Sequence, residues 1–137
     1  MNVQLEKLLS VLIIDDNEID IFLQERILQT SGMSREISSF ISPRKALAYL
    51  EGLNSRGEPF PELVLLDINM PGMNGFQFLD AFNKISGPLK ENCRFIIVTS
   101  SESMTDFEKA FSYSNVVSYK VKPLSYEDVA GFICYFK

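Results

Sequence analysis

The sequence ELVLLDINMPGMNG at residues 62–75 combines the two features from which the architecture can be inferred. Its first half is a continuous apolar run, which is typical of a strand buried on both faces of a parallel sheet. The run ends on Asp67, and the turn rich in Gly and Pro that follows leads into a helix. Three other apolar runs also end on groups that can contact a phosphate or a metal ion: VLII before Asp15 and Asp16, FIIV before Thr99, and YKV before Lys122 and Pro123.

Strand-like and helix-like segments alternate along the chain. Such alternation favours a parallel sheet with helices on both faces, and right-handed crossovers leave few topologies. We therefore expect an α/β fold, a three-layer, doubly wound (βα)5 sandwich with strand order 2-1-3-4-5. This order brings the carboxyl ends of strands 1, 3, 4 and 5 together, where open α/β sheets bind ligands. The predicted strands are 9–14, 36–41, 62–67, 94–98 and 116–121, and the predicted helices are 18–31, 43–52, 75–85, 103–113 and 125–137.

The first predicted helix has a clear start and a clear end. Asn17 can cap it, with Asp20 in the capping-box position, and Gly32 can end it. The spacing of its large apolar residues predicts a stripe that faces the core. The residues expected in this stripe are Ile19, Phe22, Leu23 and Ile27.

The second predicted helix begins at Ser42 and Pro43, a cap followed by a first-turn proline. Gly52 is expected to end it, because glycine is a poor helix former. Residues 52–61, GLNSRGEPFP, are then expected to form a turn-rich surface loop. The residues expected to face the core from this helix are Ala46, Leu47 and Leu50.

Size and composition restrict the class of protein. A chain of 137 residues with 46% hydrophobic and 23% charged residues suits one globular domain, here 1–137 with a core from about 8 to 137. The net charge of −5 argues against nucleic-acid binding. No apolar run reaches about 18 residues, so no membrane span is predicted. Cys93 and Cys134 lack CxxC or metal-ligand spacing and are expected to be reduced thiols of a cytoplasmic protein.

The three aspartates are the candidate metal ligands. Asp15, Asp16 and Asp67 should converge at one edge of the sheet, and like charges that close repel unless a cation lies between them. Mg²⁺ suits such a site because it prefers oxygen ligands. The alternative is that one or more of these acids cap helices or end strands in contact with solvent.

Phosphoryl transfer is the reaction that these groups suit best. A carboxylate such as Asp67 can attack phosphorus and form an acyl phosphate, and the ammonium of Lys122 can neutralise charge beside it. Thr99 can donate a hydrogen bond to a phosphoryl oxygen, and the backbone carbonyl of Asn69 can complete a metal shell. Taken singly, Lys122 can equally be a solvated lysine and Thr99 a strand-forming residue. The sequence has no histidine, so a phosphoryl group must come from another molecule.

These motifs resemble the receiver domain of two-component response regulators, the family of the bacterial chemotaxis regulator, over roughly residues 8–137. The resemblance implies a flavodoxin-like fold. It also implies that Asp67 in LLDINMPGMNG is the phosphoacceptor and that Asp15 and Asp16 in IIDDN are the acidic metal pair. By the same resemblance Asn69 gives a carbonyl to Mg²⁺, and Thr99 in IVTSS is the switch hydroxyl.

The resemblance extends to the fifth strand. Lys122 in YKVKP matches the family's lysine, and the peptide bond from Lys122 to Pro123 is expected to be cis. Tyr119 matches the aromatic switch, which turns inward as Thr99 moves toward the phosphoryl group. From the residues alone, Tyr119 can equally be a half-buried strand aromatic. Ser100 stands where the family prefers alanine or glycine.

The function implied is a signalling receiver, not an enzyme with a separate substrate. A sensor histidine kinase or a histidine phosphotransfer protein would donate the phosphoryl group. The signal would leave through the fourth helix, fifth strand and fifth helix to a downstream protein or a second copy of the chain. No output domain is expected, because no DNA-reading motif follows. Half of the sixteen aromatic residues fall between Phe107 and Phe136, which suits either a partner face or core packing.

Three other functions remain open from the sequence. A phosphatase of the haloacid dehalogenase type also uses an aspartate at a strand end, but it needs a second aspartate where this chain has Asn69. A receiver that acts as a scaffold without phosphorylation would not need Asp67, Thr99 and Lys122 together. A flavodoxin-like carrier of FMN shares the topology, but three acids would repel the FMN phosphate.

Overall fold

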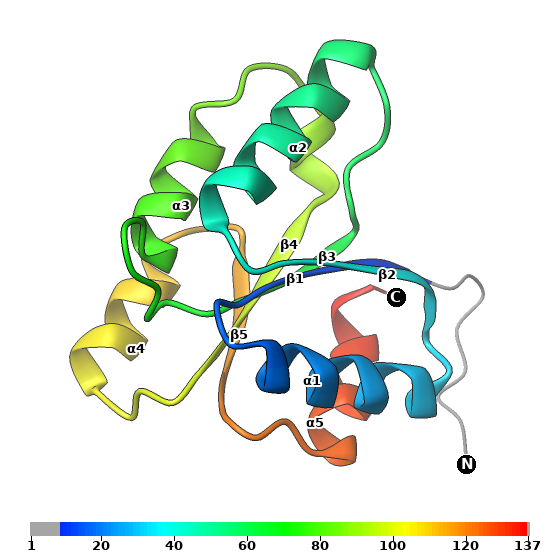
Figure 1. The fold of residues 1–137 in the computed structure, drawn as a ribbon, viewed down its shortest axis with the longest axis vertical. Helices are drawn as coiled ribbons and strands as arrows, with labels where there is room; N and C mark the ends of the chain where they lie inside the picture. Colours follow the sequence, from blue (N-terminus) through cyan, green and yellow to red (C-terminus); the bar gives the residue numbers. More distant parts are fainter. Residues whose placement is uncertain (1–8, 137) are drawn as a thin grey trace.

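The structure is a computed structural model that describes residues 9–136. Strands and helices alternate along this part of the chain (Figure 1), as predicted. Residues 1–8 and 137 of the predicted domain lie outside the described residues. The elements are β1 Leu9–Ile14, α1 Glu18–Ser31, β2 Ser34–Phe40, α2 Pro43–Arg56, β3 Leu63–Leu66, α3 Gly75–Asn83, β4 Arg94–Thr99, α4 Met104–Phe111, β5 Val116–Val121 and α5 Tyr126–Gly131, with 3₁₀ turns at Leu89–Asn92 and Phe132–Tyr135.

The strands form one parallel sheet in the order β2-β1-β3-β4-β5, which confirms the predicted fold class. Their register aligns the carboxyl ends. Ile14 pairs with Leu66, Leu66 pairs with Ile97, and Thr99 pairs with Val121. The residues that follow β1, β3 and β5, together with Thr99 at the end of β4, therefore lie along one edge of the sheet.

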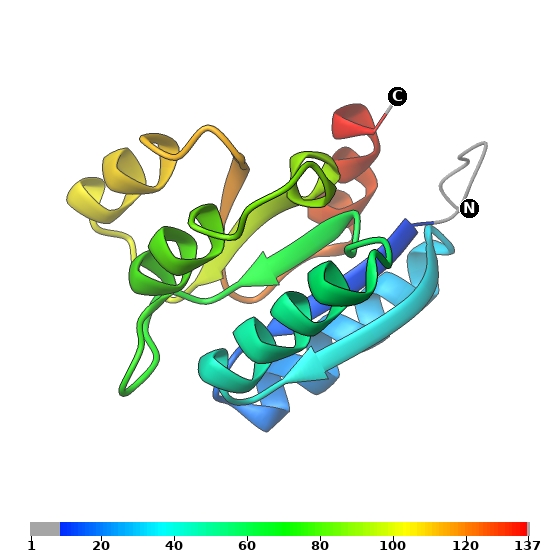
Figure 2. The same ribbon diagram turned by 90° about the horizontal axis from the view of Figure 1, so that it is seen from above.

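Two helical layers enclose the sheet (Figures 1 and 2). Helices α2, α3 and α4 pack on one face, where Phe82 and Phe95 meet edge to face with ring centroids 4.9 Å apart. Helices α1 and α5 pack on the other face around Leu28 and Phe132, both fully buried. Burying a large apolar side chain stabilises the fold by about 1.5–3 kcal/mol, so both layers hold the sheet firmly.

Helix α2 is longer than predicted. The sequence predicts an end at Gly52, but the helix continues to Arg56 and ends where Gly57 takes the left-handed conformation at φ 68°. Leu53, 6% exposed, packs in the core one residue beyond Gly52. Its burial outweighs the cost of about 1 kcal/mol for a glycine inside a helix. The predicted loop at 52–61 is therefore helical over its first half.

Helix α1 has the predicted bounds but not the predicted inward face. Ile19, Phe22 and Leu23 are 71%, 56% and 47% exposed, and Ile27 is only partly buried. The helix is rotated about its axis relative to the prediction. The residues that it buries are Ile21, Gln24, Leu28 and Ser31.

The remaining boundaries differ from the predicted ones by a few residues, except at the end of the chain. Helix α5 was expected to run from 125 to 137, but its α-helical part ends at Gly131 and a 3₁₀ turn follows. The predicted cap is present, since Ser125 and Asp128 form a capping box. Among the described residues, no helix is long and apolar enough to cross a membrane.

Candidate functional site

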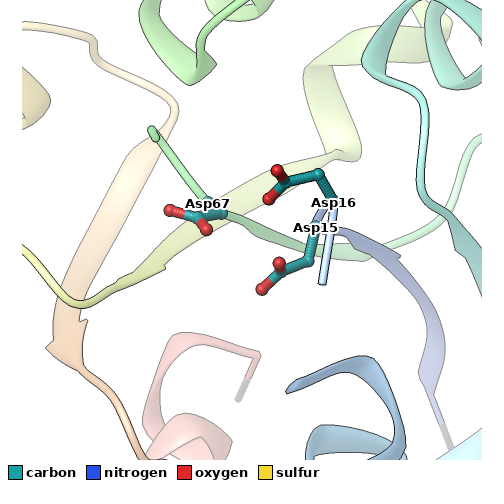
Figure 3. Close-up of side chains that lie close together, drawn as sticks. All are labelled: Asp15, Asp16 and Asp67. Carbon is teal, nitrogen blue, oxygen red and sulfur yellow. The ribbon is translucent and has the colours of Figure 1, made fainter. Parts of the chain in front are cut away.

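Three carboxylates meet at the edge of the sheet where β1 and β3 end (Figure 3). Asp15 and Asp16 follow β1 directly, and Asp67 follows β3. One oxygen from each carboxylate can be chosen so that all three lie within 4.8 Å of one another. Asp15 and Asp67 are 1% and 5% exposed, whereas Asp16 is exposed. The structure thus brings together the three acids that the sequence offers as metal ligands.

The chemistry of this cluster fits a hard divalent cation. Burial raises the pKa of the Asp15 carboxyl, because an ionised group loses its hydration there. Hydrogen bonds from Lys122 and from the backbone N–H of Asn17 act in the opposite direction without cancelling that effect. A divalent cation bound to these oxygens would offset both the desolvation and the repulsion. All three side chains offer oxygen, the donor that Mg²⁺ prefers.

Lys122 is the cation at the centre of the site. Its Nζ atom lies 2.8 Å from Asp15 Oδ2, 2.8 Å from Asp20 Oδ2 and 3.0 Å from Asp67 Oδ2. Burial lowers the pKa of Lys122, but the hydrogen bonds to these carboxylates outweigh burial and the pKa is raised. The ammonium therefore stays charged beside Asp67. The peptide bond from Lys122 to Pro123 is cis, the geometry that the resemblance implied.

The hydroxyl of Thr99 is held beside the acids by two donors. Thr99 is fully buried, and its Oγ1 accepts hydrogen bonds from Asn69 Nδ2 at 3.2 Å and from the backbone N–H of Ser101 at 3.3 Å. The backbone N–H of Asn69 donates to Asp67 Oδ1 at 3.0 Å. Asn69 thus links Asp67 to Thr99 through its own backbone and side chain. The sequence predicted a role for its carbonyl and not this side-chain contact.

Tyr119 connects the site to helix α4. Its hydroxyl donates to the carbonyl oxygen of Ser101 at 2.9 Å, two residues past Thr99. Its ring packs against Phe107 of α4 with centroids 5.4 Å apart. A displacement of Thr99 and the loop after it would therefore reach α4 through this tyrosine.

The turn after Asp67 requires glycine at one position. A Cβ atom on Gly75 would lie 2.6 Å from the carbonyl oxygen of Asp67 and 2.7 Å from the Cα of Ile68. Atoms that close clash, so only glycine lets α3 begin directly behind the acid. Asn74 caps this helix, with Gln77 completing the capping box. The sequence MPGMNG thus sets the backbone that carries Asp67.

Two further residues of the site were not predicted, and both lie on α1. Asp20 was expected to complete a capping box, but its carboxylate contacts Lys122, and the cap is provided by Asn17. Gln24, 4% exposed, donates from Nε2 to Asp15 Oδ2 at 3.3 Å. Their spacing of four residues places them on one helical face, a signal present in the sequence but masked by the apolar stripe beside it.

Comparisons with known proteins agree with this architecture. Residues 11–132 match the family model of the response regulator receiver domain. Two-component response regulator ARR17 of Arabidopsis thaliana is 35% identical to the chain, over 96% of the chain and 86% of that protein. The crystal structure of a two component response regulator from Cytophaga hutchinsonii superposes with a TM-score of 0.86 at 32% identity, covering 95% of this chain and 97% of that one. A chain of the CheX-CheY-BeF3-Mg+2 complex from Borrelia burgdorferi shares the fold at a TM-score of 0.73 and 20% identity, over 94% of this chain and 90% of that one.

The fold, the acid cluster and the family match define a receiver domain. The chain belongs to the response regulator receiver family of two-component signalling. This is a family of signalling domains, in agreement with the function expected from the sequence.

Proposed function

We propose that this receiver accepts a phosphoryl group on Asp67, from a sensor histidine kinase or a histidine phosphotransfer protein, in a reaction that requires Mg²⁺. The observation that carries the proposal is the position of Asp67. Its Oδ2 is 3.0 Å from the ammonium of Lys122, and its carboxylate also lies in the cluster with Asp15 and Asp16. A nucleophilic oxygen between a fixed cation and a candidate metal site is what phosphoryl transfer needs from a protein.

The transfer is a displacement at phosphorus. An oxygen of Asp67 forms a bond to phosphorus while the bond from phosphorus to the donor's imidazole nitrogen breaks. Lys122 gives an N–H to a phosphoryl oxygen, and the hydroxyl of Thr99 turns toward the same group. Magnesium, held by Asp15, Asp16, Asp67 and the carbonyl of Asn69, would supply positive charge for the phosphoryl oxygens.

We assign the exposed apolar residues of α1, which are Ile19, Phe22 and Leu23, to the surface that binds the phosphoryl donor. Phe22 and Leu23 line a groove with Pro123 and Leu124, the two residues that follow Lys122. A protein donor must bring its phosphohistidine to Asp67, and this apolar groove lies beside that route. An exposed phenylalanine next to a groove is also the kind of residue that anchors protein interfaces.

The signal would leave through α4, β5 and α5. Met104, Phe107, Phe111 and Val121 are large apolar residues of α4 and β5 that are exposed. Tyr119 contacts Phe107 on one side and the carbonyl of Ser101 on the other. Movement of Thr99 toward a phosphoryl group would change these contacts and hence the surface offered to a downstream protein or a second copy of the chain.

The test uses Mg²⁺ with acetyl phosphate or beryllofluoride. The wild-type protein should gain one phosphoryl group by mass spectrometry, and NMR signals at the acid cluster and on α4 should shift with beryllofluoride. The Asp67→Asn protein should do neither. Asp80→Asn, the same change on an exposed acid of α3, should behave as wild type. Equal responses from wild type and Asp67→Asn would remove Asp67 from this role.

A further inference from the structure

The Lys122 ammonium has as many carboxylate partners as it has N–H bonds. Its Nζ contacts Asp15, Asp20 and Asp67 at 2.8, 2.8 and 3.0 Å. A lysine ammonium has three N–H donors, so each donor has one acid to bind. Asp15 and Asp67 come from the ends of strands, whereas Asp20 comes from the first turn of α1.

Asp20 differs from the other two partners in one respect. Asp15 and Asp67 both belong to the acid cluster that fits a divalent cation, and Asp20 is not part of that cluster. A cation that binds the cluster draws on the oxygens of Asp15 and Asp67 and so competes with Lys122 for them. The Asp20 carboxylate then remains as the acceptor that Lys122 does not share with the metal.

Asp20 is part of a ring of hydrogen bonds that it enters through its backbone N–H and leaves through its carboxylate. The backbone N–H of Asn17 donates to Asp15 Oδ1 at 2.9 Å, and the side chain of Asn17 accepts from the backbone N–H of Asp20 at 3.1 Å. Lys122 closes the ring by contacting both Asp20 and Asp15. The position of Asp20 is thereby tied to the acid pair, and its side chain is only 29% exposed.

We propose that Asp20 is a positioning residue for Lys122. It holds the ammonium beside Asp67 when the metal occupies the neighbouring oxygens, so that one N–H is aimed at the incoming phosphoryl oxygen. This role rests on the proposed phosphorylation of Asp67 and adds a residue to it. Asp20 itself touches neither the phosphoryl group nor the metal.

If Asp20 acted only through its negative charge, its removal would raise the rate of phosphorylation, whereas loss of a positioning residue would lower it. Four carboxylates against one ammonium leave the site with a formal charge of −3, counting Asp15, Asp16, Asp20 and Asp67. Each acid that is removed lowers the repulsion of an anionic donor. A rate that falls on removal of Asp20 therefore reports the lost position of Lys122, because lost charge alone would raise it.

The experiment follows phosphorylation by acetyl phosphate at saturating Mg²⁺, with the donor concentration varied. In Asp20→Ala the rate at saturating donor should fall by about tenfold to a hundredfold, because a misplacement of about 1 Å in a reacting group can cost about a hundredfold. The donor concentration at half-maximal rate should not rise, because removal of an acid lowers the repulsion of the donor. Asp20→Asn keeps an oxygen acceptor for Lys122 and should recover part of the rate. Glu18→Ala removes an exposed acid of the same helical turn and should not slow the reaction.

The outcomes separate this role from the proposed function. Wild-type protein that takes up no phosphoryl group would overturn both. Phosphorylation of the wild type with an equal or faster rate in Asp20→Ala would overturn only the role of Asp20. Circular dichroism and thermal unfolding of the two Asp20 variants check the fold, and the partial recovery in Asp20→Asn distinguishes positioning from general loss of structure.

Discussion

Helices α1 and α2 are both fourteen residues long and cover opposite faces of the sheet, yet they bury different kinds of residue. The buried residues of α2 are Pro43, Ala46, Leu50 and Leu53, all apolar. Those of α1 include Gln24 and Ser31, while Ile19, Phe22 and Leu23 point to solvent. Hydrophobic spacing predicted the buried face correctly for α2, which lies away from the acids, and wrongly for α1.

The difference follows from what each helix borders. Helix α1 begins two residues after Asp16, and it carries Asp20 to Lys122 and Gln24 to Asp15. In this orientation Gln24 gives the buried Asp15 carboxylate a further donor and Asp20 gives the Lys122 ammonium a further acceptor, and each such hydrogen bond contributes to stability. The same inward face packs Ile21 and Leu28 in the core, so this orientation of α1 serves both polar and apolar contacts. Three other apolar residues of the helix are left exposed, and two of them line the groove that we propose for the phosphoryl donor.

The largest effects that we expect from substitutions in the two helices are on the free energy of unfolding of the protein. Leu28→Ala in α1 and Leu50→Ala in α2 should each lower the free energy of unfolding by about 2–5 kcal/mol, because both side chains are fully buried. Leu23→Ala in α1 should cost less than about 1 kcal/mol, because the side chain is already 47% exposed. Urea denaturation measures all three. A loss for Leu23→Ala as large as that for Leu28→Ala would contradict the observed rotation of α1.

A second prediction separates the outer face of α1 from that of α2. Phe22→Ser should slow phosphotransfer from a cognate phosphohistidine protein by about tenfold or more, because the donor loses an apolar contact. Phosphorylation by acetyl phosphate should not change. Tyr49→Ser, at an exposed aromatic of α2, is the matched control and should slow neither reaction. Equal slowing with both donors would mean that Phe22 acts through the acid cluster and not through docking.

The smallest expected effect concerns the inner face of α1 and depends on pH. Gln24→Leu should lower the free energy of unfolding by about 1 kcal/mol at neutral pH, because the ionised Asp15 carboxylate loses a donor. Burial already raises the pKa of Asp15 above the ordinary aspartate value of 3.8, and the variant raises it further.

The sign of the pH dependence follows from these shifts. The penalty in Gln24→Leu is present while Asp15 is ionised in the folded protein, and it shrinks as the pH falls through the raised pKa toward 3.8. Below that value Asp15 is protonated in both the folded and the unfolded chain. Denaturation of wild type and variant across this range measures the effect. Gln29→Leu, the same change on the exposed side of α1, should show no such trend.

Much of the fold could be predicted from local patterns. The bounds of β1, α1 and β5 agree with the predicted ones, because continuous apolar runs and strong caps mark them. The end of α2 could not be found in this way. Gly52 resembles a helix end, but the decision lies with Leu53, which packs in the core, and with Gly57, which takes a positive φ. Which of two nearby glycines ends a helix depends on what the residue between them contacts.

The candidate site likewise has one part that could be predicted from the sequence and another that could not. That Asp15, Asp16 and Asp67 lie near one another follows from the order of the strands, because parallel strands bring their carboxyl ends to one edge. That Lys122 contacts Asp20, and that Asn69 reaches Thr99 with its side chain, does not follow from strand order. These contacts depend on side-chain directions that are set only when α1 and the loops are packed.

The alternation of apolar runs and capped helices along the sequence predicted the fold class, and the strand ends predicted the edge at which the acids gather, because these patterns are local properties of the chain. Only the tertiary structure decided which face of α1 turns inward and which acids share the ammonium of Lys122. A helix can rotate about its axis without any change in its bounds, and the rotation depends on apolar and polar contacts with elements far apart in sequence, here those of Ile21 and Leu28 in the core and of Asp20 and Gln24 at the acid cluster.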